Sequence, residues 1–400
     1  MFDDIDQGSL RDAVAALARI ERGPTSQGER EAALQIAERL RAHGLDPRIE
    51  EGSAYDSYAR PIGALSAIGA GAGLFALVAG ARALPAVLAT LSAAAIAEDV
   101  SNGPRLFRRA TMRRRPTWNV IAEAGDRHAP RTLVVLAHHD AAPTGAIFDP
   151  TLQRLFAERF PALVERLDTS LPLWAPVVGG PLLVALGALR PGGRRMIAAG
   201  TALAAAATAA FVDIARSPIV PGANDNLTAV AALIELARLL SKRERPGLRV
   251  LLVSCGSEES LQGGMRCFAA EHFAQLPPES TMFLNLETIG SPRLAMLEGE
   301  GPLKMEDYAA PEFRDLIARV AEREGIALRR KLRSRASTDS VIASRAGYPT
   351  ATLISINAHK ALENYHLMSD TAENVNYDTL ALAVALTEAL IAELAGQTAR

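Results

Sequence analysis

The hydropathy pattern contains four long stretches without a charged side chain, in a chain of 400 residues. They cover residues 62–81, 83–97, 169–189 and 196–212, and a short segment that contains arginine separates the members of each pair. The pattern therefore predicts two apolar helical hairpins. A helix needs about 20 mainly apolar residues to cross a bilayer. The first and third stretches have that length, and the second and fourth are shorter.

Outside these hairpins the pattern alternates between helix and strand. Apolar residues at helical spacing predict helices over residues 9–22, 27–43, 227–240, 264–273, 311–324 and 378–394. Short β-prone runs predict strands over residues 46–51, 119–122, 132–137, 248–254, 281–286 and 350–356. Such alternation predicts an α/β fold, in which a mostly parallel mixed sheet has helices on both faces.

The two hairpins interrupt this α/β pattern and define the predicted domains. Residues 1–60, 116–165 and 213–400 form one catalytic domain. Residues 61–115 hold the first hairpin with an arginine-rich flank, and residues 166–212 hold the second. Gly69 and Gly73 have the GxxxG spacing that allows close helix packing. Two uses of the hairpins remain open: membrane association through residues 62–97 and 169–212, or burial against the core or a second subunit of a homo-oligomer.

Composition and charge narrow the class of protein. The formal net charge of −2 argues against a nucleic-acid partner. Hydrophobic residues at 49% and charged residues at 22% exclude a mainly disordered chain. The first residues lack the apolar core of a secretory signal peptide. Six arginines between residues 105 and 115 exceed the three between residues 190 and 195, which favours a cytoplasmic catalytic domain on the inner membrane. A soluble cytoplasmic protein is the alternative.

Candidate chemistry lies at the predicted carboxyl ends of strands, where open α/β sheets bind ligands. The residues concerned are His138, His139, Asp140, Asn224, Asp225, Glu258, Glu259, Glu287, Tyr365 and His366. Each motif alone has an ordinary interpretation, such as a helix cap or a solvated acidic pair. Together, imidazoles and carboxylates suit zinc with an open coordination position. Two zinc ions bridged by a carboxylate would use the whole set.

The order of these motifs resembles the di-zinc aminopeptidases, whose wider family includes glutamate carboxypeptidase II. GANDNLTAVA (222–231) is similar to the family segment GADDNxSGxA, and GSEESLQGG (256–264) to EExGxxGS. STDSVIASRAGYPTATL (337–353) resembles SDHxxFxxxGIPA. The resemblance is weak over residues 1–55, good over residues 116–145 and 221–395, and absent from both hairpins.

The resemblance implies a set of metal ligands. One zinc would be held by His138 and Glu287, and the other by Glu259 and His366. Asp225 would bridge the two ions. Cobalt or manganese could replace zinc with the same ligands. The family usually has Asp where this chain has Glu287, and both residue types occur there.

The resemblance also implies the roles of residues around the metals. Asp140 would orient the His138 imidazole. Glu258 would be the general base. Tyr365 would hydrogen-bond the oxyanion, with a packing role as its alternative. His139 should point to the opposite side of the extended chain and has no assigned role. Residues 338–340 lack the family's histidine, which puts a substrate contact in doubt.

The implied function is a zinc aminopeptidase that removes N-terminal residues from short peptides. Two alternatives remain: an amidase or deacylase acting on N-acyl amino acids, and a non-catalytic membrane scaffold with the same fold. The lid-bearing zinc deacylases share nearly the same ligand order. However, too few residues separate Glu259 from His366 for their inserted domain.

Overall fold

The computed structural model describes residues 4–242 and 246–398. Its centre is one mixed sheet with the strand order β1-β2-β4-β3-β5-β9-β6-β7, and β8 also pairs with β6. The strands are β1 Arg48–Ala54, β2 Arg115–Gly125, β3 Thr132–His138, β4 Arg249–Cys255, β5 Thr281–Leu286, β6 Arg293–Glu300, β7 Glu306–Asp307, β8 Arg329–Ser334 and β9 Thr350–Ile356. The four central strands, β4, β3, β5 and β9, are parallel to one another. Antiparallel strands flank them on both sides.

Side chains of the central strands alternate between two cores. Leu133, Val135 and Ala137 of β3 lie in the larger core, whereas Val134 and Leu136 lie in a second core on the other face. Helices α1 (Gln7–Leu17), α2 (Gln27–Ala42), α10 (Thr228–Ser241), α12 (Pro311–Arg323) and α14 (Tyr377–Thr398) contribute to the first core. Helices α11 (Gly263–His272) and α13 (Ser340–Arg345) contribute to the second. The predicted mixed sheet with helices on both faces is confirmed.

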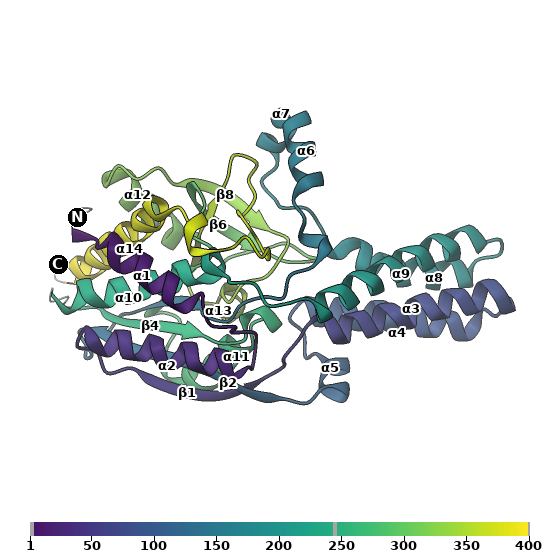
Figure 1. Cartoon of the computed structure of the whole chain (residues 1–400), viewed down its shortest axis with the longest axis horizontal. Helices are drawn as coiled ribbons and strands as arrows, with labels where there is room; N and C mark the ends of the chain where they lie inside the picture. The colour runs from purple at the N-terminus through teal and green to yellow at the C-terminus, as the bar shows by residue number, and fades with distance from the viewer. Residues whose placement is uncertain (1–3, 243–245, 399–400) are drawn as a thin grey trace.

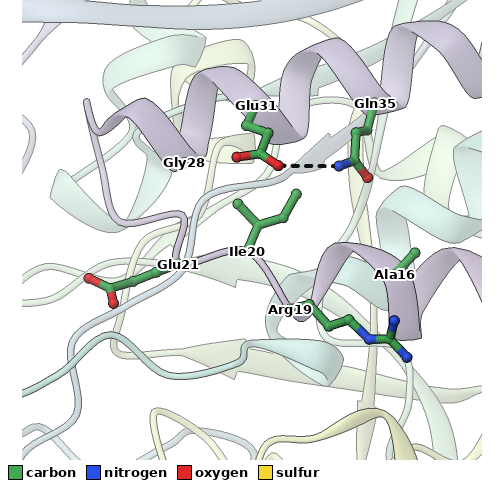
Figure 2. Close-up of a pocket in the computed structure, with 7 residues that line it drawn as sticks. All are labelled: Ala16, Arg19, Ile20, Glu21, Gly28, Glu31 and Gln35. Carbon is green, nitrogen blue, oxygen red and sulfur yellow. Dashed lines mark hydrogen bonds between the residues drawn. The ribbon is translucent and has the colours of Figure 1, made fainter.

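Some predicted boundaries are wrong. The first helix ends at Leu17, not at Arg22, because the chain turns there and the Arg22 side chain enters the protein interior. Strands β6 and β8 were not predicted. The apolar run of β6 is only four residues long, from Leu294 to Leu297, and β8, with the sequence RRKLRS, has a single apolar residue. Between α1 and α2 lies a pocket of about 590 Å³ (Figure 2), lined by Arg19, Glu21 and Glu31 among others.

The two hairpins pack against each other as one four-helix bundle, which extends from one side of the α/β domain (Figure 1). Its helices are α3 (Ala59–Ala79), α4 (Ala83–Val100), α8 (Trp174–Leu189) and α9 (Arg194–Arg216). Both described chain ends lie on the side of the domain opposite the bundle (Figure 1). The short helix α5 (Leu106–Thr111) lies beside the base of the bundle, whereas α6 (Thr151–Arg159) and α7 (Pro161–Arg166) project away from the domain as a separate pair (Figure 1).

Helix lengths in the bundle differ from those expected. The third apolar stretch forms a helix of only 16 residues, because helix α8 starts at Trp174 after Pro172. The fourth stretch forms the 23-residue α9, which begins with the arginines of the preceding loop. Within the described residues, four helices are long and apolar enough to cross a membrane: α3, α4, α9 and residues 377–396 of α14. In α14, 78% of the residues of the apolar stretch are buried inside the protein. The corresponding share is 44% in α3, 44% in α4 and 28% in α9. Helix α14 is therefore a core helix.

Arginines mark both ends of the bundle. At the outer end, Arg82 donates to the Arg190 carbonyl at 3.0 Å and Arg194 donates to the Leu77 carbonyl at 2.9 Å, which joins the two hairpin loops. At the base, Arg105 and Arg108 are buried and do not form part of a solvated flank. The exposed arginines of the flank are Arg109, Arg113, Arg114 and Arg115, and those of the tip are Arg82, Arg190, Arg194 and Arg195. Each end of the bundle therefore has four exposed arginines, and the flank at the base has no excess of exposed positive charge over the tip.

Gly73→Ala is expected to destabilise the bundle by about 1–3 kcal/mol through overpacking. A Cβ at Gly73 would lie 2.0 Å from Thr201 Oγ1 and 2.9 Å from Val184 Cγ2. Gly71→Ala is the matched control, since no atom lies within 4 Å of its Cβ position. Alanine there should stabilise the helix by roughly 0.5–1 kcal/mol. Thermal unfolding of both variants in neutral detergent measures the difference, and equal shifts would contradict this packing.

Candidate active site

His138, the last residue of β3, is at the centre of a buried group of acids. Its Nε2 lies 3.2 Å from Glu287 Oε1 and 3.4 Å from Asp225 Oδ1. Its Nδ1 faces Asp140, at 3.2 Å from the backbone carbonyl and 3.4 Å from Oδ1. Adjacent parallel strands end at the same edge of the sheet, so β3 and β5 bring His138 and Glu287 together although their sequence positions are far apart.

Asp225 lies in the turn that precedes α10. Asp370 fixes this turn, because its carboxylate accepts the backbone N–H groups of Asn224 at 2.8 Å and Asp225 at 3.0 Å. The two Asp225 oxygens then face different imidazoles. Oδ1 lies 3.4 Å from His138 Nε2, and Oδ2 lies 3.4 Å from His366 Nε2. This is the arrangement that a bridging ligand requires.

The second imidazole completes the group. His366 Nε2 lies 3.3 Å from Glu259 Oε2. The structure thus brings all five predicted ligands together, as two His–Glu pairs that share Asp225. Ligand atoms of His138, Asp225 and Glu259 all lie within 4.8 Å of one another.

Unsatisfied polar atoms test whether this group fits a metal. Among the described residues, Asp225 Oδ2 and both ring nitrogens of His366 are buried without a hydrogen-bond partner. Buried polar atoms normally have partners. The Asp225 carboxylate and the lone pair of a neutral His366 imidazole come from two separate segments and fit zinc, which binds nitrogen and carboxylate oxygen.

The electrostatics of the group favour binding of a cation. Burial alone would lower the pKa of both histidines, but the surrounding carboxylates raise that of His366 to about 10 and that of His138 well above its ordinary value. Burial raises the pKa of Glu258 well above its usual range, and it also raises the pKa of Glu259. A cation would stabilise the ionised carboxylates of the group.

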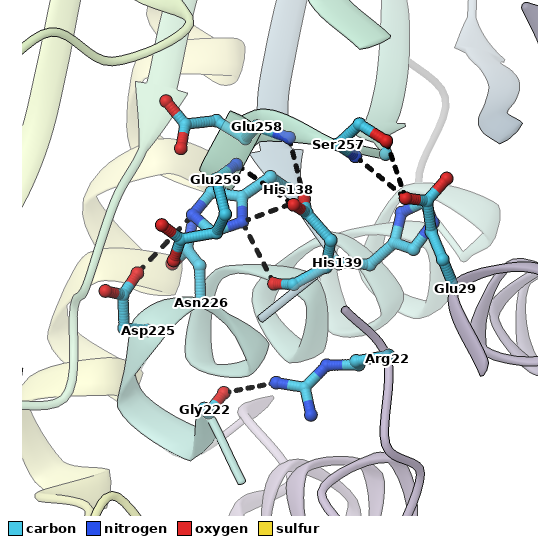
Figure 3. Close-up of polar contacts among 12 residues, drawn as sticks. Arg22, Glu29, His138, His139, Gly222, Asp225, Asn226, Ser257, Glu258 and Glu259 are labelled. Atoms are coloured by element: carbon cyan, nitrogen blue, oxygen red, sulfur yellow. Dashed lines mark hydrogen bonds and ion pairs between the residues drawn. The ribbon is translucent and has the colours of Figure 1, made fainter. Parts of the chain in front are cut away.

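Asp140 has a contact that the sequence did not predict. Besides facing His138, its Oδ1 accepts the N–H of Glu258 and its Oδ2 accepts the N–H of Glu259, both at 2.9 Å. Figure 3 shows Glu258 and Glu259 beside His138. One carboxylate therefore positions both a predicted metal ligand and the segment that bears the predicted base.

Glu258 and Tyr365 lie beside the predicted ligands. Glu258 is 9% exposed, and its Oε1 accepts a hydrogen bond from Gln262 Nε2 at 2.9 Å. The Tyr365 ring stacks on the His366 ring with centroids 3.9 Å apart. Burial raises the pKa of the Tyr365 hydroxyl well above its usual range, so it is a proton donor at neutral pH. Their assigned roles stay predictions.

Two buried charged residues near the site were missed. Arg22 donates to the carbonyls of Pro221 at 2.5 Å and Gly222 at 2.6 Å, just before the Asp225 turn (Figure 3). Glu29 accepts from the N–H and the hydroxyl of Ser257, at 3.1 and 2.7 Å. In the sequence, Arg22 is a polar residue at the end of a helical pattern. Glu29 follows Ser26 at capping-box spacing, so it gives no sign of a distant partner.

Other residues lie close to the site although the sequence did not assign them a role there. The Phe148 ring lies over His366, with ring centroids 4.5 Å apart. Asp339 is buried, and burial together with nearby carboxylates raises its pKa to about 8. His139 is buried away from the predicted ligands, and its Nδ1 lies 2.9 Å from Ser254 Oγ. Burial lowers the pKa of His139 to about 4, so the ring is neutral at pH 7.

Comparison with known proteins gives this geometry a family context. The model of peptidase family M28 matches residues 207–391. The chain resembles the M28 peptidases. Asp225, Glu258, Glu259, Glu287 and His366 lie inside the matched segment, whereas His138 and Asp140 precede it. The M28 match also leaves out most of the bundle.

One curated protein and several solved structures are also similar to this chain. The uncharacterized protein YfbL of Escherichia coli (strain K12) is 29% identical over 185 residues, which are 41% of this chain and 57% of YfbL. The aminopeptidase from Aneurinibacillus sp. strain AM-1 has a TM-score of 0.57 at 13% identity, over 98% of this chain and 94% of that one. The zinc aminopeptidase from Bacillus subtilis has a TM-score of 0.56 at 13% identity, over 97% and 94%.

The same fold also occurs in a different kind of enzyme. Glutaminyl cyclase from Bacteroides thetaiotaomicron, solved with N-acetylhistamine, has a TM-score of 0.56 at 12% identity. The match covers 97% of this chain and 98% of that one. At such identities the similarity establishes the fold alone, and the reaction has to be argued from the residues of the site.

Proposed function

We propose that this protein is a zinc-dependent aminopeptidase that hydrolyses short peptides at their N-terminal residue. The observation that carries the proposal is the pair of His–Glu sets that share Asp225, with Glu258 beside them. His138 and Glu287 would hold one zinc ion, and His366 and Glu259 the other. Zinc in such a site acts as a Lewis acid, which polarises a carbonyl oxygen and lowers the pKa of water.

The chain supplies the proton transfers. The Glu258 carboxylate takes a proton from the attacking water and delivers it to the amine that leaves. The Tyr365 hydroxyl donates a hydrogen bond to the oxygen on which negative charge develops. Asp140 keeps Glu258 in place through its backbone N–H, so the base needs little reorganisation.

The alternatives differ in what they require of the fold. Between Glu259 and His366 the chain builds α11, α12, α13 and the strands β5 to β9, all within the single sheet and its covering helices. This segment contains no inserted lid domain, which favours a peptidase over the lid-bearing deacylases. A scaffold without activity would have no need for Glu258 beside a full ligand set.

A metal assay combined with a substrate panel tests the proposal. Purified protein in neutral detergent is expected to hold about two zinc equivalents and to lose hydrolysis on treatment with a chelator. The panel contains peptides with a free N-terminus, N-acyl amino acids and N-terminal glutaminyl peptides. Hydrolysis of the first group alone supports an aminopeptidase. Hydrolysis of N-acyl amino acids identifies a deacylase, and cyclisation of glutaminyl peptides identifies a cyclase.

We further propose that the four-helix bundle anchors the protein in a membrane. At 1.5 Å per residue, the 21 residues of α3 and the 23 of α9 extend about 30–35 Å, the thickness of a bilayer core. Large apolar side chains are exposed along the bundle, among them Leu74, Leu91 and Leu186. Placement of the catalytic domain on the cytoplasmic side of the inner membrane remains a proposal, because the exposed arginines no longer favour either end.

A further inference from the structure

A second pocket lies where the bundle meets the α/β domain. It measures about 520 Å³ and is formed by the end of β1, the segment between α4 and α5, helix α5, and residues 260–266 at the start of α11. Four arginines line it: Arg105, Arg109, Arg114 and Arg266. Among its lining residues in the described part of the chain there is no carboxylate.

Neutral oxygen atoms accept hydrogen bonds from two of these arginines but do not neutralise their positive charge. The Arg105 guanidinium donates to Asn102 Oδ1 at 2.7 Å and to the Leu261 carbonyl at 2.5 Å. Arg266 donates to the carbonyl and the side-chain oxygen of Asn102, at 3.0 and 2.9 Å. Over residues 4–242 and 246–398, none of the four pocket arginines forms an ion pair with a carboxylate. Arg108, just outside the pocket, differs because it pairs with Asp99 through two bonds of 2.6 and 3.0 Å.

Two guanidinium donors in the pocket wall are unsatisfied. Arg105 is only 5% exposed, and its Nε is buried without a hydrogen-bond partner among the described residues. The same holds for Nε of Arg266. Buried N–H donors normally have an acceptor. Burial, followed by repulsion from Arg266 and Arg108, lowers the pKa of Arg105 well below its usual range. An anion in the pocket would offset the repulsion among these guanidinium groups.

The other pocket of similar size shows that charge is the distinguishing feature. The pocket between α1 and α2 measures about 590 Å³, and Figure 2 shows Arg19 there together with Glu21 and Glu31. Two carboxylates against one guanidinium do not attract an anion. The two pockets therefore have similar volumes but differ in charge. The pocket at the bundle base is lined by four arginines and, within the described residues, by no carboxylate.

We propose that the pocket formed by Arg105, Arg109, Arg114 and Arg266 binds a phosphate-bearing anion. Guanidinium groups match phosphate oxygens with paired, charge-assisted hydrogen bonds. The volume lies in the range of small-ligand sites. At the base of the apolar helices, the pocket lies at the level where phospholipid headgroups end if the bundle crosses a bilayer. The phosphate could therefore belong to a lipid headgroup or to a soluble molecule.

The pocket also connects to the candidate active site. Ser260 lines it and directly follows Glu258 and Glu259. Arg108 donates to the Ser260 carbonyl at 2.7 Å, and Arg105 donates to the next carbonyl, that of Leu261. An anion that orders these arginines would hold the same loop that carries the predicted base. The binding proposal itself does not depend on the peptidase proposal.

Calorimetric titration of the full-length protein in neutral detergent tests the binding. The probes are inorganic phosphate, short-chain phosphatidylglycerol and, as the uncharged-headgroup comparison, short-chain phosphatidylcholine. Saturable binding of phosphatidylglycerol but not of phosphatidylcholine indicates a lipid headgroup. Binding of inorganic phosphate with equal affinity indicates a soluble phosphate ligand. Affinity for either anion should fall as the salt concentration rises.

Variants of exposed arginines keep the test independent of folding. The double variant Arg109→Gln, Arg114→Gln should weaken binding roughly tenfold or more, since each charge-assisted hydrogen bond contributes that order. Arg19→Gln, in the other pocket, should leave the affinity unchanged. The proposal is overturned if no anionic probe binds the wild-type protein, or if the double variant binds as tightly as the control.

Discussion

Glu258→Gln is expected to lower kcat by roughly 10²–10⁴-fold while the bound metal remains unchanged. The carboxamide has nearly the same size as the carboxylate, and its oxygen can still accept the hydrogen bond from Gln262. The Glu258 N–H bond to Asp140 involves only the backbone and is kept. The substitution therefore removes the ability to accept a proton and little else. Steady-state kinetics on a chromogenic aminoacyl substrate, with metal analysis of the same sample, measure both quantities.

Asp225→Ala provides the contrasting variant. Because Asp225 faces both His138 and His366, its loss should reduce metal content as well as activity. The two variants thus separate a proton-transfer role from a ligand role. A Glu258→Gln protein with near-normal kcat would contradict the base assignment. An Asp225→Ala protein with full metal content would contradict the bridging assignment.

The protein is expected to remain in the membrane pellet after washes with high salt and alkaline buffer, and to be released by detergent. Three helices of the bundle have the length and hydropathy of membrane spans, and their apolar side chains point outward. Peripheral proteins leave the membrane in such washes because only polar contacts hold them. Recovery of the protein in the soluble fraction without detergent would exclude insertion.

Cysteine labelling locates the membrane boundary more finely. Leu91→Cys, at a position 61% exposed on α4, should resist a water-soluble maleimide in intact membranes. Leu152→Cys, at a position 80% exposed on α6, should react readily. The wild-type chain measures the background from its two free cysteines. Labelling at Arg190→Cys from one side of sealed vesicles then assigns the orientation of the bundle tip.

Much of the fold and the candidate ligands could be predicted because the information is local. Buried parallel strands such as β5 and β9 are short runs of mostly apolar and β-branched residues, and their ends were placed correctly. Since such strands finish at one sheet edge, residues following them were expected to meet. The approach of His138 to Glu287 follows from this rule, whereas Asp225 reaches His138 from the turn that precedes α10.

The remaining features depend on distant partners and leave no local pattern. The role of Arg22 depends on the carbonyls of residues 221 and 222, about 200 residues further along the chain, which accept its hydrogen bonds. Strand β8 is charged, and it forms because β6 offers a free edge. The sequence predicted two hairpins but not that Gly73 of the first would contact Thr201 of the second. Arg105 and Arg108 belong to an arginine-rich segment that was expected to be exposed to solvent. Contacts with residues distant in the sequence bury both side chains instead.

The position of the second hairpin has a consequence for biosynthesis. Helices α8 and α9 lie in the sequence between His138 and Asp225. During synthesis, these two candidate ligands are therefore separated by two apolar helices. The first hairpin, already made, supplies the surface on which the second packs. Asp225 leaves the ribosome only after both α8 and α9 have been made, and Glu259, Glu287 and His366 follow later still. A chain still under synthesis therefore exposes its apolar helices before it can assemble the candidate ligand set.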